Sequence, residues 1–215
     1  MGDDETRSRR PSAGRHGAPA PESAVEERVR AALARMDRAR ALDEALTGFG
    51  AEIFGFMTAV TEEPRAARAA YASFEGLVSE HLATFTWGGA LRTWMYRLAR
   101  VVLRRSRETS PASFATNPSD GAVAPPPFGE QPYRRTDSRS MADALRRALR
   151  PEDREILILR VDRRFSWRQL AITQIGEDAT TRDTEREAAR LRKRFQVVRQ
   201  QLTRRAIRHG IIGPR

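Results

Sequence analysis

Apolar residues recur at steps of three and four along most of the chain, which is the spacing that one face of a helix requires. In the first half this pattern predicts four helices, over residues 23–42, 50–60, 66–85 and 91–105. Ser23 and Glu26 have capping-box spacing, so we expect the first helix to begin at Ser23. Trp87, Gly88 and Gly89 predict a turn before the fourth helix.

The second half shows the same pattern with clearer helix starts. Pro151 suits the first turn of a helix, and the acids that follow it suit the positive end of the helix dipole. Ser166, with Gln169 three residues on, predicts the N-cap of another helix. Residues 176–183 read as a loop. The last predicted helix, "LRKRFQVVRQQLTRR", spans residues 191–205 and carries an apolar stripe of Leu191, Phe195, Val198 and Leu202.

Two segments without helical periodicity divide the chain. Residues 1–22 are polar and rich in Gly and Pro, which predicts a disordered tail. Residues 106–140 hold six of the 12 prolines and predict a flexible linker. We therefore expect an all-α protein with two small helical domains, at 23–105 and 141–212, the second a helix-turn-helix.

Composition limits the partners and the compartment. The formal net charge of +11 and the pI of about 11.3 favour a polyanionic partner, nucleic acid first and an anionic membrane surface second. No apolar run is long enough to cross a bilayer, and no signal-peptide core is evident. The absence of cysteine excludes disulfides and thiol chemistry. A soluble cytoplasmic protein is the expectation.

The last helix concentrates positive charge. From Arg190 to Arg208 there are eight basic residues and no acid. Each phosphate that such a helix neutralises releases counterions, and Arg and Gln side chains can also bond base edges in the major groove. We therefore expect an apolar face docked on the domain and a basic face on DNA. The alternative is a solvated basic helix that stabilises a bundle.

The fourth helix mixes aromatic and basic residues. Trp94 and Tyr96 lie among Arg92, Arg97 and Arg100, an arrangement suited to single-stranded DNA, in which bases stack on rings and arginines follow phosphates. A Trp in a helix is also a common core residue. The sequence leaves both interpretations of Trp94 open.

Three stretches in order resemble the sigma-70-family RNA polymerase sigma factors of the small, extracytoplasmic-function type. "FTWGGALRTWMYRLAR" is similar to the family's region 2, "ALRPEDREILILRV" followed by "FSWRQLA" resembles the start of region 4, and "LRKRFQVVRQQL" resembles its recognition helix. The resemblance covers most of residues 40–105 and 141–208.

The resemblance implies a factor that binds core RNA polymerase and directs promoter recognition, with promoter DNA and core polymerase as partners and an anti-sigma factor as a further candidate. It places strand opening at the minus-ten element on Arg92, Trp94, Tyr96, Arg97 and Arg100. It places major-groove contacts at the minus-thirty-five element on Arg190, Arg192, Lys193, Gln196 and Arg199. Ser166 and Arg168 would begin the supporting helix and touch phosphates.

Three departures from the family keep a second function open. The acidic segment expected to face the polymerase is replaced by "AARAAYAS", Val101 stands where asparagine is expected, and the stretch between Ala171 and Leu191 is longer than a tight turn. The alternative is a stand-alone or degenerate sigma-like helix-turn-helix regulator that does not direct polymerase. The three histidines are dispersed and no catalytic or metal motif is present, so we expect neither an enzyme nor a cofactor.

Overall fold

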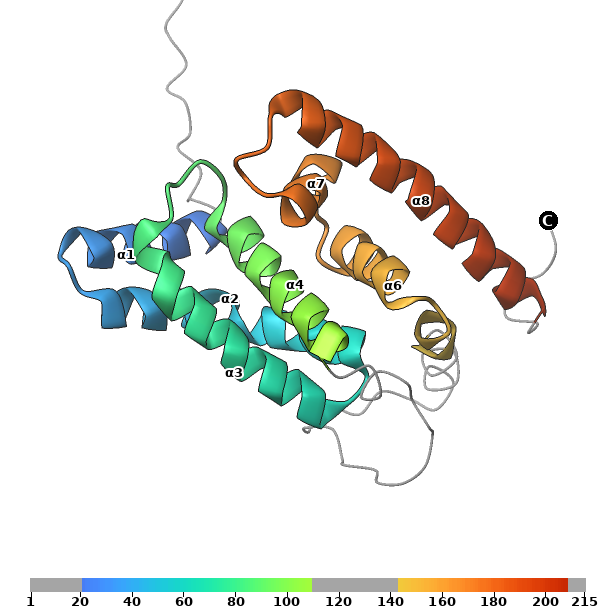
Figure 1. Ribbon diagram of the computed structural model, residues 1–215, viewed down its shortest axis with the longest axis horizontal. Coiled ribbons are helices and arrows are strands. Elements are labelled where there is room, and N and C mark those ends of the chain that lie inside the picture. The colour runs from blue at the N-terminus through green and yellow to red at the C-terminus, as the bar shows by residue number, and fades with distance from the viewer. Residues whose placement is uncertain (1–20, 110–142, 209–215) are drawn as a thin grey trace, which may run out of the picture.

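The computed structural model describes residues 21–109 and 143–208, and every regular element in these ranges is helical (Figure 1). The predicted all-α class is confirmed. The elements are α1 (Pro21–Ala34), α2 (Arg38–Thr61), α3 (Pro64–His81), η1 (Leu82–Thr84), α4 (Leu91–Thr109), α6 (Pro151–Leu157), the π-helical turn η3 (Ile158–Asp162), α7 (Trp167–Ile175) and α8 (Thr181–Arg208). Residues 143–147 are also helical.

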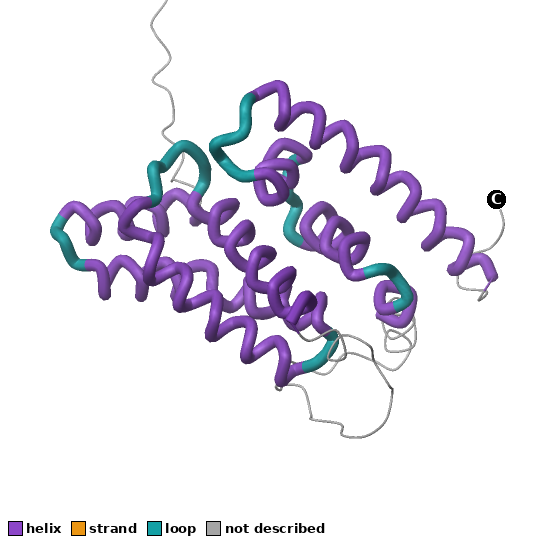
Figure 2. Tube along the Cα trace, viewed as in Figure 1, coloured by secondary structure: helices purple, strands orange, loops and turns teal. Residues whose placement is uncertain are grey.

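The first half is a bundle of α1 to α4, in which α2 packs against each of the other three (Figure 2). Its core is built from large side chains at helical spacing. Ile53, Phe56 and Met57 of α2 are fully buried, as are Phe74 of α3 and Met95 of α4. These side chains recur at helical spacing within the predicted helices, so an apolar stripe on each helix explains how the bundle closes.

The predicted boundaries of the first helix were wrong at both ends. The helix begins at Pro21, two residues before Ser23, and the chain turns at residues 35–37 where one continuous helix was expected. Met36 matches the apolar period but takes a left-handed backbone conformation and is 83% exposed. Asp37 then caps α2, because its carboxylate accepts a hydrogen bond from the Arg40 amide at 2.9 Å.

The start of α4 is fixed from a distance. Glu26 of α1 accepts a hydrogen bond from the Leu91 amide at 2.6 Å, so the acid expected to cap its own helix caps α4 instead. The predicted turn at residues 87–89 lies in the loop before α4. The helix continues to Thr109, four residues into the segment predicted as a linker. Residues 1–20 and 110–142, with the rest of the predicted tail and linker, lie outside the described residues.

The helices of the second half begin where the sequence signals predicted, except for α8. Pro151 lies at the beginning of α6 with Glu152 and Asp153 in the first turn, and Ser166 and Gln169 form a complete capping box on α7. The last helix begins at Thr181, ten residues before the predicted start at Leu191. The loop from α7 to α8 is therefore five residues long, and the stretch thought too long for a tight turn is mostly helix.

One hydrophobic cluster runs through both halves. It joins the core of α1 to α4 to Ile156, Leu159 and Phe165 around α6, and to Leu170 and Leu191 of α7 and α8. Helix α4 lies against α7, and α2 against α6 (Figure 1). The division into two separate domains therefore stays a prediction. Among the described helices, none has the length and apolar character needed to cross a bilayer.

Candidate nucleic-acid interface

Helix α8 is held to the protein by its apolar stripe. The predicted positions Leu191 and Val198 are fully buried, and Phe195 and Leu202 are partly buried. The ring of Phe195 packs edge-on against Trp167 of α7, with ring centroids 5.5 Å apart. The inner face of α8 is thus committed to packing, which leaves the opposite face to solvent (Figure 1).

The outer face of α8 carries the predicted major-groove residues. Arg192, Lys193, Gln196 and Arg199 are all exposed. Within the described part of the chain, no ion pair or side-chain hydrogen bond engages them. Arg192, Gln196 and Arg199 follow one another at helical steps of four and three, so they form one stripe along the helix. This stripe, which we call the α8 basic stripe, is positive, exposed and able to donate several hydrogen bonds.

Not every arginine of α8 belongs to that surface. Arg194 points inward and binds the buried carboxylate of Asp153 through Nε at 2.5 Å and Nη2 at 2.8 Å. Arg205 donates to the carbonyl oxygen of Ala148 at 2.7 Å. Arg190, a predicted groove residue, is exposed but holds Glu187 at 2.6 and 2.7 Å. Two of the eight cations counted in the sequence therefore fasten α8 to α6 and the residues before it.

The beginning of α8 adds candidates that the sequence interpretation missed. Arg182 was assigned to a loop and Arg186 to no predicted helix, but both lie exposed on the first two turns of α8. In a helix-turn-helix the first turns of the recognition helix contact base edges. A signal was present, because Thr180 and Asp183 have capping-box spacing and the Thr180 hydroxyl oxygen accepts from the Asp183 amide at 3.1 Å.

The predicted supporting helix α7 begins beside the middle of α8, where Trp167 packs against Phe195. Ser166 and Arg168 are exposed, as a phosphate contact would require. The Ser166 hydroxyl oxygen accepts from the Gln169 amide at 3.2 Å, and the hydroxyl proton remains available to a phosphate oxygen. Gly176 ends α7 at φ 98°, a conformation that side chains other than glycine rarely adopt, and so makes the sharp turn toward α8 possible.

The predicted strand-opening residues of α4 lie in a different setting. Arg92 binds Glu52 of α2 at 2.7 and 3.0 Å and reaches the carbonyl oxygen of Arg163 in the second half at 3.4 Å. Tyr96 is fully buried between Phe56 of α2 and Phe165 of the second half. These two side chains are therefore enclosed by the second half of the protein.

Trp94 is a core residue in this arrangement. Its side chain is 6% exposed, and its ring lies 5.1 Å from that of Phe85 in the same half of the protein. Burial also raises the pKa of Tyr96, with the Glu52 carboxylate as a smaller cause in the same direction. Of the two interpretations of Trp94 that the sequence left open, the structure supports core packing.

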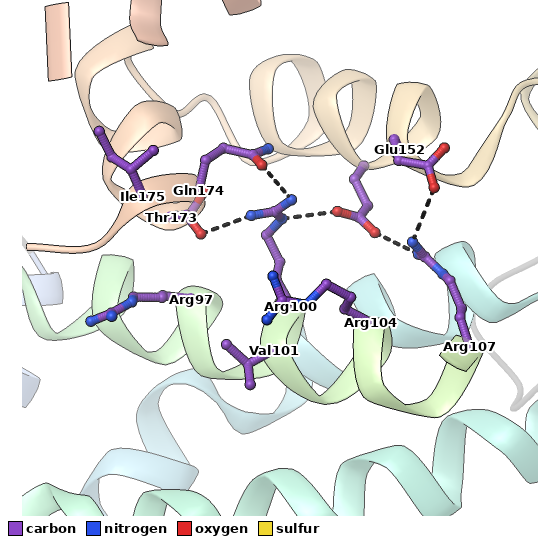
Figure 3. Close-up of a pocket in the computed structure, with 10 residues that line it drawn as sticks. Arg97, Arg100, Val101, Arg104, Arg107, Glu152, Thr173, Gln174 and Ile175 are labelled. Carbon is purple, nitrogen blue, oxygen red and sulfur yellow. Dashed lines mark hydrogen bonds and ion pairs between the residues drawn. The ribbon is translucent and has the colours of Figure 1, made fainter. Parts of the chain in front are cut away.

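Arg100 lies at the centre of the contact between the halves (Figure 3). Its Nε donates to Glu155 at 2.9 Å, its Nη1 to the Thr173 carbonyl oxygen at 2.7 Å, and its Nη2 to Gln174 Oε1 at 2.7 Å. Arg107, two helical turns further along α4, binds the other oxygen of Glu155 at 2.5 Å. Glu155 is thus clamped between two arginines of α4, with its side chain 4% exposed.

A groove of about 370 Å³ runs along this contact. It is lined on one side by Arg97, Arg100, Arg104 and Arg107, with Val101 at the position where the resembling family has asparagine. The far end meets the turn after α7, where Arg97 lies against Gly176. There, burial raises the pKa of Glu177 and the positive charge of Arg97 opposes that rise.

The described residues hold no group of three or more side chains suited to a metal ion. Of the seven predicted residues around α7 and α8, all are exposed, whereas Arg92, Trp94, Tyr96 and Arg100 of α4 are largely enclosed.

No protein-family model matches the chain, and no curated protein sequence matches it either. A functional proposal therefore has to rest on the arrangement of the residues, which consists of one exposed basic surface on α8 and one largely enclosed basic helix, α4.

Proposed function

We propose that this protein is a sigma-like promoter-specificity factor that binds core RNA polymerase and directs transcription initiation. The observation that carries the proposal is the α8 basic stripe, Arg192, Gln196 and Arg199, exposed on a helix whose opposite face is packed on α7 and α6. A short loop joins α7 to α8, as in a helix-turn-helix, in which the second helix enters the major groove. The stripe would read the upstream promoter element.

The chemistry of the stripe fits duplex DNA. Arginine can bond the O6 and N7 atoms of guanine with two hydrogen bonds, and glutamine can do the same at N6 and N7 of adenine. Exposed cations beside them, such as Lys193 and Arg168, would neutralise phosphates and position the helix. The net charge of +11 supports the same class of partner.

The first half supports the polymerase part of the proposal through its resemblance to sigma region 2, carried by "FTWGGALRTWMYRLAR". In the structure these residues form the loop before α4 and its first turns, with Leu91, Met95 and Ala99 on the buried face. A four-helix bundle, followed by the short helix α7, a five-residue loop and the long basic helix α8, fits a factor that contacts polymerase with one half and upstream DNA with the other.

A second candidate function is a stand-alone DNA-binding regulator. Helix α3 corresponds to the element in which the sigma family that the chain resembles has an acidic, polymerase-facing segment. Here the exposed positions from Pro64 to Ser73 carry no acid; they are Pro64, Arg65, Arg68, Ala69, Ala72 and Ser73. A basic or neutral α3 surface would weaken binding to a polymerase surface that is complementary to acidic residues. DNA binding through α8 would be unaffected.

Binding to core polymerase separates the two functions. The purified chain, mixed with bacterial core RNA polymerase that lacks any sigma factor, should elute with the polymerase on gel filtration. A charge-altered variant, Arg65→Glu with Arg68→Glu, serves as the matched probe of α3 and should change the affinity. If the folded chain stays apart from core polymerase yet binds duplex DNA, the stand-alone regulator is correct.

A further inference from the structure

The groove along α4, which we call the α4 groove, carries more positive charge than its own acids neutralise. Four arginines of α4 line it, and the acids of the opposite wall are Glu152 and Glu155. Glu155 is held by two of these arginines, and Glu152 lies 3.6 Å from Arg107. The surplus positive charge therefore belongs to the other arginines that line the groove, Arg97 and Arg104.

Within the described part of the chain, Arg97 and Arg104 have no strong partner. The Arg97 side chain lies against Gly176 and forms no hydrogen bond or ion pair with another described residue. The Glu177 carboxylate feels the charge of Arg97 but does not line the groove. Arg104 is paired with Glu108 at 3.8 Å, and this pair contributes little because the two side chains are 72% and 67% exposed. Both guanidinium groups are therefore available to an anion in the groove.

The spacing of these two arginines suits an anion that carries several charges in a row. Arg104 follows Arg97 by seven residues, which is two turns of α4 and about 10.5 Å along the helix axis. Arg100 and Val101 lie between them and line the same groove. Arginine binds phosphate oxygens through paired hydrogen bonds, so a chain of phosphates can engage both guanidinium groups at once.

The end of α7 supplies the opposite wall with a donor and an apolar contact (Figure 3). Gln174 Oε1 accepts a hydrogen bond from Arg100 at 2.7 Å, which leaves the amide nitrogen of Gln174 to donate to a ligand. Arg100 also binds the Thr173 carbonyl oxygen at 2.7 Å, so this negative group is already paired with a cation. Ile175, 40% exposed, and Val101 are the apolar side chains that line the groove.

The size and the charge boundary of the groove favour a small molecule over a nucleic acid strand. Its volume of about 370 Å³ lies near the lower end of the range for small-molecule sites, roughly 300–1,000 Å³. Ile175 separates it from a neighbouring hollow in which two arginines face two acids. That hollow is lined by Ile175, Ala179, Asp183, Arg186, Glu187 and Arg190. A basic track long enough for a strand is therefore interrupted at Ile175.

We propose that the α4 groove is a binding site for a small anion with a chain of phosphates, which Arg97 and Arg104 hold and Gln174 contacts. The phosphate chain can be an inorganic polyphosphate or part of a nucleoside polyphosphate, whose nucleoside would lie against Val101 and Ile175. Binding requires no separation of the two halves, because both walls are in place in the packed structure. The site does not depend on the proposed function, since it needs neither DNA nor polymerase.

The first test is isothermal titration calorimetry on the full chain at physiological salt, with tripolyphosphate, ATP and adenosine as separate probes. Tripolyphosphate and ATP should bind, and adenosine should not. Tighter binding of ATP would support a nucleoside polyphosphate as the ligand, and equal binding would support the phosphate chain alone. Absence of binding by both triphosphates would overturn the inference, as would a single-stranded DNA that binds where neither of them does.

The second test removes equal charge from inside and outside the groove. Arg97→Ala with Arg104→Ala removes the two cations assigned to the anion. Arg105→Ala with Arg186→Ala removes two exposed cations that do not line the groove. The first pair should weaken tripolyphosphate binding at least about tenfold more than the second, because it loses charge-assisted hydrogen bonds. Equal losses would overturn the inference, since the anion would then respond only to the net charge of the chain.

Thermal melts check that each variant folds. If Arg97→Ala disturbs the turn at Gly176, the comparison passes to Arg104→Glu and Arg105→Glu, which change neighbouring exposed positions of which only the first lines the groove. Arg104→Glu should lose at least about tenfold more affinity, and equal losses would overturn the inference. These readouts use the free chain, so failure to bind core polymerase would defeat the proposed function and leave this site standing.

Discussion

Three arginines of α8 allow a sharp test of which face meets DNA. Arg192 and Arg199 belong to the α8 basic stripe, and Arg194, between them in sequence, points inward to Asp153. The double variant Arg192→Ala with Arg199→Ala removes two exposed cations without touching a packed side chain. Arg194→Ala removes one cation that stabilises the fold through its ion pair with Asp153.

The expected effect of the double variant depends on whether the arginines contact phosphates or bases. If both stripe arginines contact phosphates, the slope of log affinity against log salt should fall by about 1.8 for duplex DNA. If either one bonds a base edge, the loss should be about 1–3 kcal/mol for the preferred sequence and small for others. The melting temperature should stay that of the parent, because exposed substitutions away from packed groups change stability little.

Arg194→Ala should show the opposite pattern. Its Asp153 partner is 4% exposed and would be left as a buried carboxylate without its cation. Arg194 itself is 41% exposed, so solvent screens part of the interaction and the loss of stability should lie toward the lower end of about 1–3 kcal/mol. The salt slope should change less than in the double variant.

The assay is fluorescence anisotropy with duplexes enriched from a random library, between about 50 and 200 mM salt, beside thermal melts of each variant. Over that range a slope smaller by about 1.8 means that the loss of affinity with salt is roughly tenfold smaller. An unchanged slope and affinity in the double variant would refute the assignment of this face to DNA. So would a double variant that is destabilised while Arg194→Ala is not.

Three further predictions concern single residues. Trp94→Ala should cost about 3–5 kcal/mol of unfolding free energy, because the ring is buried against Phe85, and a melt as stable as the parent would contradict core packing. Gly176→Ala should destabilise by about 1–3 kcal/mol, because the new Cβ would lie 2.9 Å from Arg97 Nη2 at a positive φ, whereas Gly76→Ala on open α3 surface should stabilise; equal melting temperatures would refute this. Burial raises the pKa of Glu177 above its ordinary value, so the folded chain binds that proton more tightly and loses stability as pH rises through the raised pKa. Glu177→Gln should therefore raise the melting temperature at pH 7 and flatten its pH dependence, and a lower melting temperature would count against the assignment.

The sequence allowed the helices to be found where large apolar side chains carry the period. Leu191, Phe195, Val198 and Leu202 marked the inner face of α8 correctly. The ten residues before Leu191 were missed because their buried positions, Thr184 and Ala188, are small and give no apolar signal. The break after α1 was missed for a related reason, since its only local sign is the capping side chain of Asp37.

The candidate site divides in the same way. The exposed residues of α8 could be predicted because one helix, its apolar stripe and its charge are all local properties of the chain. The enclosure of α4 could not, because Arg100 meets partners 55, 73 and 74 residues away, and no local pattern specifies such pairs. The sequence likewise offered Arg194 as one more cation, and only its packing against α6 separates it from the stripe.

The most direct measurement of the central claim is promoter-selective transcription. Core polymerase would be incubated with fragments of the source genome, with and without the protein, and the 5′ ends of the RNA products would be sequenced. A promoter-specificity factor should create new start sites that share two sequence elements at a constant spacing, and Arg192→Ala with Arg199→Ala should weaken the preference at the upstream one. A folded protein that adds no start site to those of core polymerase alone would contradict the account.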